Sequence, residues 1–123
     1  MTKKVFIVDD EVSFTRMLKA NLERTGRYSV VTENDPMVAR EAAKSFEPDV
    51  MFLDVMMPGM EGGELAALMR EDKTLAAVPI VFMTAIVTKE ETGDSIGEIG
   101  GNMFLAKPVK LQDVLDAIQK VTS

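Results

Sequence analysis

The sequence predicts an α/β protein in which five parallel strands form one sheet with helices on both faces. Short, continuously apolar segments alternate along the chain with longer segments whose apolar residues recur at helical spacing. Strands that are apolar on both sides are typical of a parallel sheet buried between helices. Right-handed connections then give an open, doubly wound sheet. The 123 residues suffice for one hydrophobic core, and we expect one domain over residues 1–123.

Each kind of element has its own pattern. The strands are apolar runs bounded by polar or turn residues. They are expected at residues 4–8, 28–32, 49–53, 79–83 and 103–106. The helices have apolar residues three and four positions apart. They are expected at residues 11–25, 35–46, 63–71, 88–99 and 111–121.

Local signals mark where several of these helices begin and end. Gly26 follows the first helix and suits its C-terminal end. Asp35 and Pro36 combine an N-cap with a first-turn proline, which favours a helix start. The fourth helix is the weakest, because Gly93 and Gly97 each cost up to about 1 kcal/mol relative to alanine inside a helix. It is expected to be either a short, frayed helix or a mobile face whose order depends on the functional state of the protein.

The composition excludes several kinds of chemistry. The absence of cysteine excludes disulfides and thiolate metal sites, and the absence of histidine removes the commonest general base. The net charge is −6 and the 14 basic residues are scattered, so we expect no direct binding to nucleic acid. No apolar run approaches the roughly 20 residues that span a bilayer, so we expect no membrane contact. The absence of cysteine fits a reducing compartment, and we expect a cytoplasmic location. Catalysis must therefore use carboxylates, hydroxyls, lysines and a hard metal ion.

Polar residues occur where the predicted strands end. Asp9 and Asp10 follow the first strand, Asp54 the third, Thr84 the fourth and Lys107 the fifth. In an open parallel sheet, ligands bind beyond the carboxyl ends of the strands. We therefore expect these side chains to share one rim of the sheet.

The second strand is followed by Thr32-Glu33-Asn34, from which we expect no comparable contribution. Taken singly, each group at the other strand ends has an ordinary explanation. An aspartate after a strand is most often an N-cap or turn residue, a threonine a turn hydroxyl, and a lysine a solvated charge. Their occurrence together at four of the five strand ends favours a functional site.

Together these groups suit phosphoryl transfer. Clustered carboxylates repel one another unless a cation lies between them, and Mg²⁺ prefers oxygen ligands and is often completed by a phosphate. Asp54 would be the nucleophile, because carboxylates form acyl phosphates. Lys107 and Thr84 would each hold an equatorial oxygen of the phosphoryl group.

Four segments resemble the receiver domain of two-component response regulators, and the resemblance covers essentially the whole chain. They are VFIVDDE at residues 5–11, DVMFLDVMMPGMEG at 49–62, FMTA at 82–85 and FLAKP at 104–108. The resemblance implies a flavodoxin-like fold whose five-stranded parallel sheet has the order 2-1-3-4-5. It also implies a signalling phospho-acceptor, not an enzyme, that catalyses its own phosphotransfer and self-dephosphorylation.

By this resemblance, Asp54 is the aspartate that becomes phosphorylated. Asp9 and Asp10 hold Mg²⁺ together with Asp54, and Asp10 is the more direct ligand of the acidic pair. The main-chain carbonyl of Met56 is a further metal ligand.

The resemblance also implies the parts of a switch. Thr84 moves onto the phosphoryl group, Lys107 pairs with that group, and Phe104 turns inward when Thr84 moves. Phe104 lacks the hydroxyl of the tyrosine often found there, so packing alone would separate its two states. A cis peptide bond is expected between Lys107 and Pro108, since proline tolerates the cis form at a cost of about 0.5–1 kcal/mol.

Two apolar residues flank the expected route of water to the phosphoaspartate. Met56 lies two positions after Asp54, and Ile86 lies two positions after Thr84. Neither side chain can orient an attacking water, and both can exclude it. We therefore expect slow self-dephosphorylation.

Because the chain has no histidine, a phosphohistidine donor must lie on another protein. The resemblance implies a sensor histidine kinase or a histidine phosphotransfer protein, and we expect small acyl phosphates to serve as donors too. A downstream protein target would bind the face of the fourth helix, fifth strand and fifth helix. Alternatively, the chain is one domain of a longer protein and controls an attached output domain.

The sequence disfavours three other functions. Phosphatases of similar topology generally need a second aspartate two residues beyond the nucleophile, where this chain has Met56. A receiver-like protein that only binds partners would lack an acidic, hydroxyl or lysine group of the site, and none is missing. A dinucleotide binder is disfavoured because no G-x-G-x-x-G motif follows the first strand.

Overall fold

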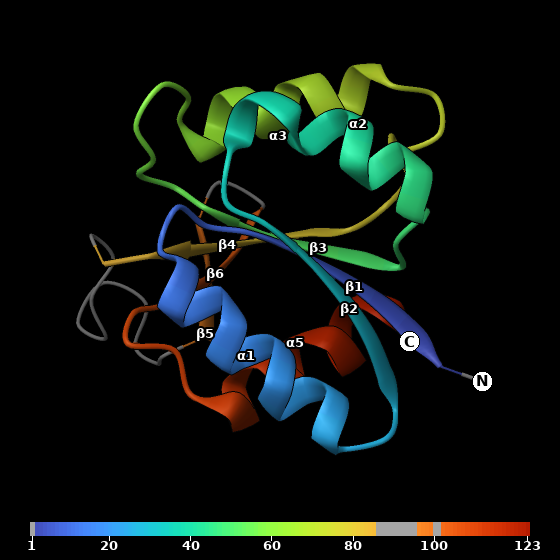
Figure 1. Cartoon of the computed structure of the whole chain (residues 1–123), viewed down its shortest axis with the longest axis vertical. Coiled ribbons are helices and arrows are strands. Elements are labelled where there is room, and N and C mark those ends of the chain that lie inside the picture. The colour runs from blue at the N-terminus through green and yellow to red at the C-terminus, as the bar shows by residue number, and fades with distance from the viewer. Residues whose placement is uncertain (1, 86–95, 100–101) are drawn as a thin grey trace.

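The computed structural model describes residues 2–85, 96–99 and 102–123, and it places one sheet between two layers of helices (Figure 1). The strands are β1 (Lys3–Val8), β2 (Tyr28–Glu33), β3 (Val50–Asp54), β4 (Ile80–Thr84), β5 (Ile96–Ile99) and β6 (Asn102–Ala106). The helices are α1 (Val12–Arg24), α2 (Pro36–Phe46), α3 (Gly62–Glu71) and α5 (Leu111–Thr122). Among the described residues, no helix is long and apolar enough to cross a lipid bilayer.

Five parallel strands lie in the order β2-β1-β3-β4-β6. Since β6 is the fifth strand expected from the sequence, the predicted order 2-1-3-4-5 and the doubly wound α/β class are confirmed. The chain moves from β1 outward to β2 and then crosses back to β3. In open α/β sheets, the ends of the strands at such a reversal form the usual ligand crevice.

The prediction of a helix over residues 88–99 is wrong where the structure describes that segment. Residues 96–99 form β5, which pairs antiparallel with β6 and extends the expected five-stranded sheet to six strands. Gly97 weakens a helix at this place, whereas pairing with β6 satisfies the backbone. Ile99 of β5 pairs with Asn102 of β6 in this antiparallel ladder. Residues 88–95 of the predicted helix lie outside the described residues.

The two faces of the sheet carry separate hydrophobic cores. Val5 and Ile7 belong to the cluster under α1 and α5, whereas Phe6 and Val8 belong to the cluster under α2 and α3. Figure 1 shows these two pairs of helices on opposite sides of the sheet. Because side chains alternate along a strand, Asp9 continues the series of Val5 and Ile7 at the end of β1.

The predicted signals at α1 and α2 have the expected geometry. Gly26 follows α1 with a φ of 78°, a conformation that glycine adopts without strain. Pro36 opens α2, and Oδ1 of Asp35 accepts a hydrogen bond of 2.9 Å from the main-chain N–H of Met37. These signals set the directions in which the chain leaves α1 and enters α2.

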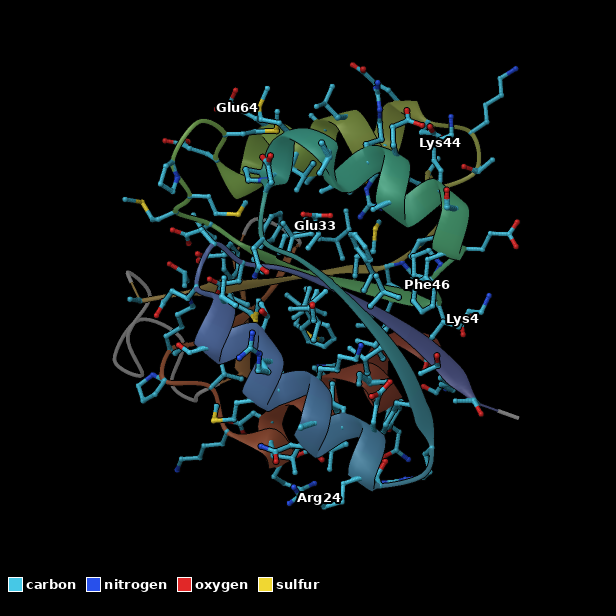
Figure 2. All side chains as sticks on the ribbon, viewed as in Figure 1. Lys4, Arg24, Glu33, Lys44, Phe46 and Glu64 are labelled. Atoms are coloured by element: carbon cyan, nitrogen blue, oxygen red, sulfur yellow. The ribbon has the colours of Figure 1, made fainter. Side chains whose placement is uncertain are left out.

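Contacts at the amino ends of the strands join α2 to β1. Nζ of Lys4 donates to the carbonyl oxygen of Phe46 at 2.9 Å and lies 5.3 Å from the centroid of its ring, and Figure 2 shows the two side chains together. The main-chain N–H of Lys4 donates to Oδ2 of Asp49 at 2.8 Å. The groups expected to carry the chemistry lie at the opposite end of the sheet.

Candidate functional site

Four strand ends bring the predicted site residues to one rim. Asp9 directly follows β1, Asp54 is the last residue of β3, Thr84 is the last residue of β4, and Lys107 follows β6. The parallel registers of β1 with β3 and of β4 with β6 bring the carboxyl ends of these strands level with one another. Asp9, Asp54 and Thr84 are buried there.

Lys107 joins the carboxylates of this rim. Its Nζ lies 2.8 Å from Oδ2 of Asp9, 3.4 Å from Oδ1 of Asp54 and 3.6 Å from Oε1 of Glu11. The same nitrogen lies 5.1 Å from the centroid of the Phe14 ring. One ammonium group therefore faces two buried carboxylates and one exposed carboxylate.

The buried position of Asp54 alters its proton affinity. Burial, together with the charge of Asp9, raises the pKa of Asp54 from 3.8 to about 6, although Lys107 and the main-chain N–H of Met56 oppose this shift. Burial by itself lowers the pKa of Lys107, but its hydrogen bonds to Asp9 and Asp54 and their charges outweigh that effect and raise it. The negative charge at this site exceeds what one ammonium group balances.

Three carboxylates form a cluster that suits a hard cation. Asp9, Asp10 and Asp54 each offer one oxygen, and these oxygens lie within 4.8 Å of one another. Asp9 and Asp54 are buried, whereas Asp10 is exposed. Mg²⁺ takes oxygen ligands, keeps several waters and is usually held by one or two carboxylates. This donor set, closed on one side and open to solvent on the other, fits that preference.

Thr84 and Phe104 lie on one face of the sheet. Phe104 pairs in register with Phe82, and their ring centroids are 5.3 Å apart in a stacked arrangement. Thr84 is two residues beyond Phe82 in β4, and alternate residues of a strand share a face. Thr84 is buried and Phe104 is half-buried.

The remaining predicted residues lie around this rim or beyond the described residues. The side chain of Met56 is exposed in the loop after β3, while its main-chain N–H bonds to the carboxylate of Asp54. The peptide bond between Lys107 and Pro108 is cis, the form that the resemblance implies. Ile86 lies outside the described residues.

Two residues at the site were not expected from the sequence. The side-chain amide of Asn34, after β2, donates to the main-chain carbonyl of Asp9 at 2.7 Å, although no contribution was expected from that strand end. The one sign of this contact in the sequence is the predicted strand order, which places the second strand beside the first. A Cβ atom at Gly62 would overlap the carbonyl oxygen of Asp54 and lie 3.0 Å from Cα of Val55, so only glycine fits there. No local pattern predicts such a contact.

Comparisons with known proteins agree with this geometry. The chain is 37% identical over 116 residues to the alkaline phosphatase synthesis transcriptional regulatory protein PhoP of Bacillus subtilis, which covers 93% of the chain and 46% of PhoP. The chain also spans 24% of the response regulator PleD of Caulobacter vibrioides and 51% of the DNA-binding response regulator MtrA of Mycobacterium leprae, so it covers about half or less of each of these three relatives.

Solved structures show the same fold. The chemotaxis protein CheY4 of Vibrio cholerae superposes with a TM-score of 0.82 at 30% identity, covering 98% of this chain and 99% of that one. The receiver domain of the sensor histidine kinase PA1611 of Pseudomonas aeruginosa has a TM-score of 0.80 at 23% identity with full coverage of both chains. That structure has a magnesium ion coordinated in its active-site cleft.

The family match covers nearly the whole chain. Residues 5–119 match the model of the response regulator receiver domain, and this range includes every strand end described above. The chain therefore belongs to the response regulator receiver domain family of two-component signalling.

Proposed function

We propose that Asp54 accepts a phosphoryl group from a phosphohistidine on another protein, in a reaction that requires Mg²⁺. The observation that carries this proposal is the placement of the Asp54 carboxylate, which is buried beside Asp9 and Asp10 and lies 3.4 Å from Nζ of Lys107. A nucleophile, a cation-binding cluster and a fixed positive charge thus share one rim.

The carboxylates of Asp9, Asp10 and Asp54 and the main-chain carbonyl of Met56 would hold Mg²⁺. The ion, when bound, neutralises charge on the oxygens of the transferred phosphoryl group. Asp10 is the exposed member of the cluster, so it can bind the ion either directly or through water. Asp9 is held by Lys107 and stabilises the ammonium group beside Asp54.

In the transfer step, an oxygen of Asp54 forms a new bond to phosphorus while the phosphorus–nitrogen bond of the donor breaks. The electron pair of that bond goes to the imidazole nitrogen, which takes up a proton. Lys107 would hold one phosphoryl oxygen by charge, and the Thr84 hydroxyl would hold another. The domain itself would supply this catalysis, so a small acyl phosphate would also serve as a donor.

Phosphorylation would be reported through Thr84 and Phe104. A movement of Thr84 toward the phosphoryl group changes the space available on the face that it shares with Phe104 and Phe82. The surface that would respond includes β6 and α5, together with the predicted fourth-helix segment. A downstream protein or an attached output domain would bind this surface.

We propose that the reaction takes place in the cytoplasm, because a chain without cysteine suits a reducing compartment.

The donors proposed are a sensor histidine kinase or a histidine phosphotransfer protein. The 123 residues contain no histidine, so the phosphohistidine would lie outside this domain. We further propose that self-dephosphorylation is slow, because Met56, exposed beside the site, cannot orient an attacking water. Ile86 would act in the same way.

Beryllofluoride, a phosphoryl mimic, tests this function. In the presence of Mg²⁺, it is expected to shift the NMR amide signals of residues at the rim and along β6 of the wild-type protein. Asp54→Asn should abolish the shifts, whereas Asp116→Asn, which changes an exposed aspartate on α5, should retain them. Equal shifts in wild type and Asp54→Asn would overturn the proposal.

A further inference from the structure

We propose that Asn34 is a positioning residue of the metal site, which holds the peptide between Asp9 and Asp10 and thereby sets the affinity for Mg²⁺. The inference rests on the function proposed above, because it concerns the same acidic cluster. It assigns a role to the end of β2, the one parallel strand end from which the sequence predicted no contribution to the site.

The hydrogen bonds of Asn34 have an unambiguous direction. Its Nδ2 donates to the main-chain carbonyl oxygen of Asp9 at 2.7 Å and to Oγ1 of Thr15 at 2.9 Å. A carbonyl oxygen only accepts, so the nitrogen of the amide must face Asp9, and its two hydrogens serve both partners. The Thr15 hydroxyl in turn donates to the carbonyl of Val12 at 3.1 Å, which leaves its lone pairs for Asn34. Thr15 is buried, so this chain of bonds is shielded from water.

The other polar atoms of Asp9 are also engaged. Its main-chain N–H donates to the carbonyl of Glu33 at 3.2 Å. Its Oδ1 accepts from the main-chain N–H of Glu11 at 3.0 Å, and its Oδ2 accepts from Lys107 at 2.8 Å. The contact with Asn34 therefore completes the set that fixes this buried residue.

The carbonyl that Asn34 holds belongs to the peptide plane that leads to Asp10. Asp10 is exposed, so its carboxylate is placed mainly by the backbone that carries it. By fixing this peptide plane, Asn34 fixes the direction in which Asp10 leaves the buried site. Both acidic residues of the β1 end thus depend on one neutral side chain.

Asn34 is itself held on a rigid backbone. Oε2 of Glu33 accepts from the main-chain N–H groups of Asn34 and Asp35, each at 3.1 Å, and Figure 2 shows Glu33 beside the sheet near its upper helix layer. Asp35 caps α2. An amide that projects from so constrained a turn can position its partner, and outer partners of metal ligands typically change metal affinity by about 10–100-fold.

Calorimetric titration of the unphosphorylated chain with Mg²⁺ alone tests this role. Asn34→Ala is expected to weaken Mg²⁺ binding by about tenfold. Asn34→Ser should do the same, because its shorter side chain cannot reach the carbonyl oxygen of Asp9. Thr15→Val is the matched control: it removes the second partner of Asn34 but leaves the bond to Asp9. It should lower the melting temperature and leave the Mg²⁺ affinity unchanged.

The outcomes separate this inference from the proposed function. Wild-type Mg²⁺ affinity in both Asn34 variants, accompanied by a melting temperature lowered as in Thr15→Val, would show a purely structural residue and overturn the inference alone. Absence of Mg²⁺ binding by the wild-type chain would overturn both. Weaker binding in the Asn34 variants and unchanged binding in Thr15→Val would support the positioning role.

Discussion

The ammonium nitrogen of Lys107 lies 2.8 Å from Oδ2 of Asp9, although β3 and β4 separate their strands in the sheet. This pair bridges the rim and places the positive charge 3.4 Å from Asp54. The two carboxylates are buried and Lys107 is only 16% exposed. Lys107 is therefore the internal counter-ion of both carboxylates.

Lys107→Gln is expected to lower the free energy of unfolding in Mg²⁺-free solution by about 2–3 kcal/mol, because it leaves two buried carboxylates without their cation. Added Mg²⁺ should restore part of the loss, whereas the same ion should stabilise the wild type less. Urea denaturation at pH 7.5 measures both effects. Lys110→Gln is the control, because Lys110 is exposed. A loss equal to that of the control would contradict the assignment of Lys107 as the internal counter-ion.

Asp54→Asn is expected to stabilise the Mg²⁺-free protein at pH 8 and to have little effect at pH 4. The pKa of Asp54 is raised to about 6 in the folded protein, so folding favours its protonated form. Its contribution to stability therefore falls as pH rises from about 4 to 6 and stays low above that range. Asparagine resembles the protonated carboxyl at every pH. Denaturation curves across this range in a chelating buffer check the prediction, and a gain that does not vary with pH would be inconsistent with it.

Gly62→Ala is expected to impair both folding and phosphorylation, because its Cβ would overlap the carbonyl oxygen of Asp54. We expect a loss of about 1–3 kcal/mol in unfolding free energy from this overpacking. The adjacent Gly63→Ala is the matched control, since a Cβ there meets open space. It should be neutral or stabilising by up to about 1 kcal/mol. Equal changes in unfolding free energy for the two substitutions would contradict the prediction that the close approach of α3 to β3 requires glycine at position 62.

Met56→Asn is expected to shorten the lifetime of the phosphoryl group, because an amide at this position can orient an attacking water. Met37→Asn serves as the control: Met37 is also an exposed methionine, but it lies on α2. The decay of the phosphorylated proteins at neutral pH is followed by intact-mass measurement. A wild-type half-life of seconds, or equal decay in all three proteins, would refute the proposed protection by Met56.

The sequence predicts the class and strand order of this fold because the signals involved are local. Continuous apolar runs mark the buried strands, and the residues directly after them, such as Asp54, must lie at the carboxyl rim once the sheet is parallel. The cap at Asp35 and the stop at Gly26 are likewise read within a few residues. Such features depend little on what the rest of the chain does.

The features that escaped prediction depend on contacts between distant segments. Residues 96–99 form a strand because β6 offers pairing that a glycine-containing helix cannot match. Asn34 reaches Asp9 only because β2 lies beside β1, and Gly62 is required only because α3 begins against the end of β3. The pairing of Lys107 with Asp9 is another such contact. In each case the residue's neighbours, not its own pattern, decide its role.

The most direct test of the account is to locate the phosphoryl group. The chain is incubated with Mg²⁺ and a small acyl phosphate such as acetyl phosphate, and the modified residue is identified by peptide mass spectrometry. We expect one phosphoryl group per wild-type chain, on Asp54, and none on Asp54→Asn or on wild type without Mg²⁺. Modification at another residue, or undiminished modification of Asp54→Asn, would contradict the claim that Asp54 is the phosphoryl acceptor.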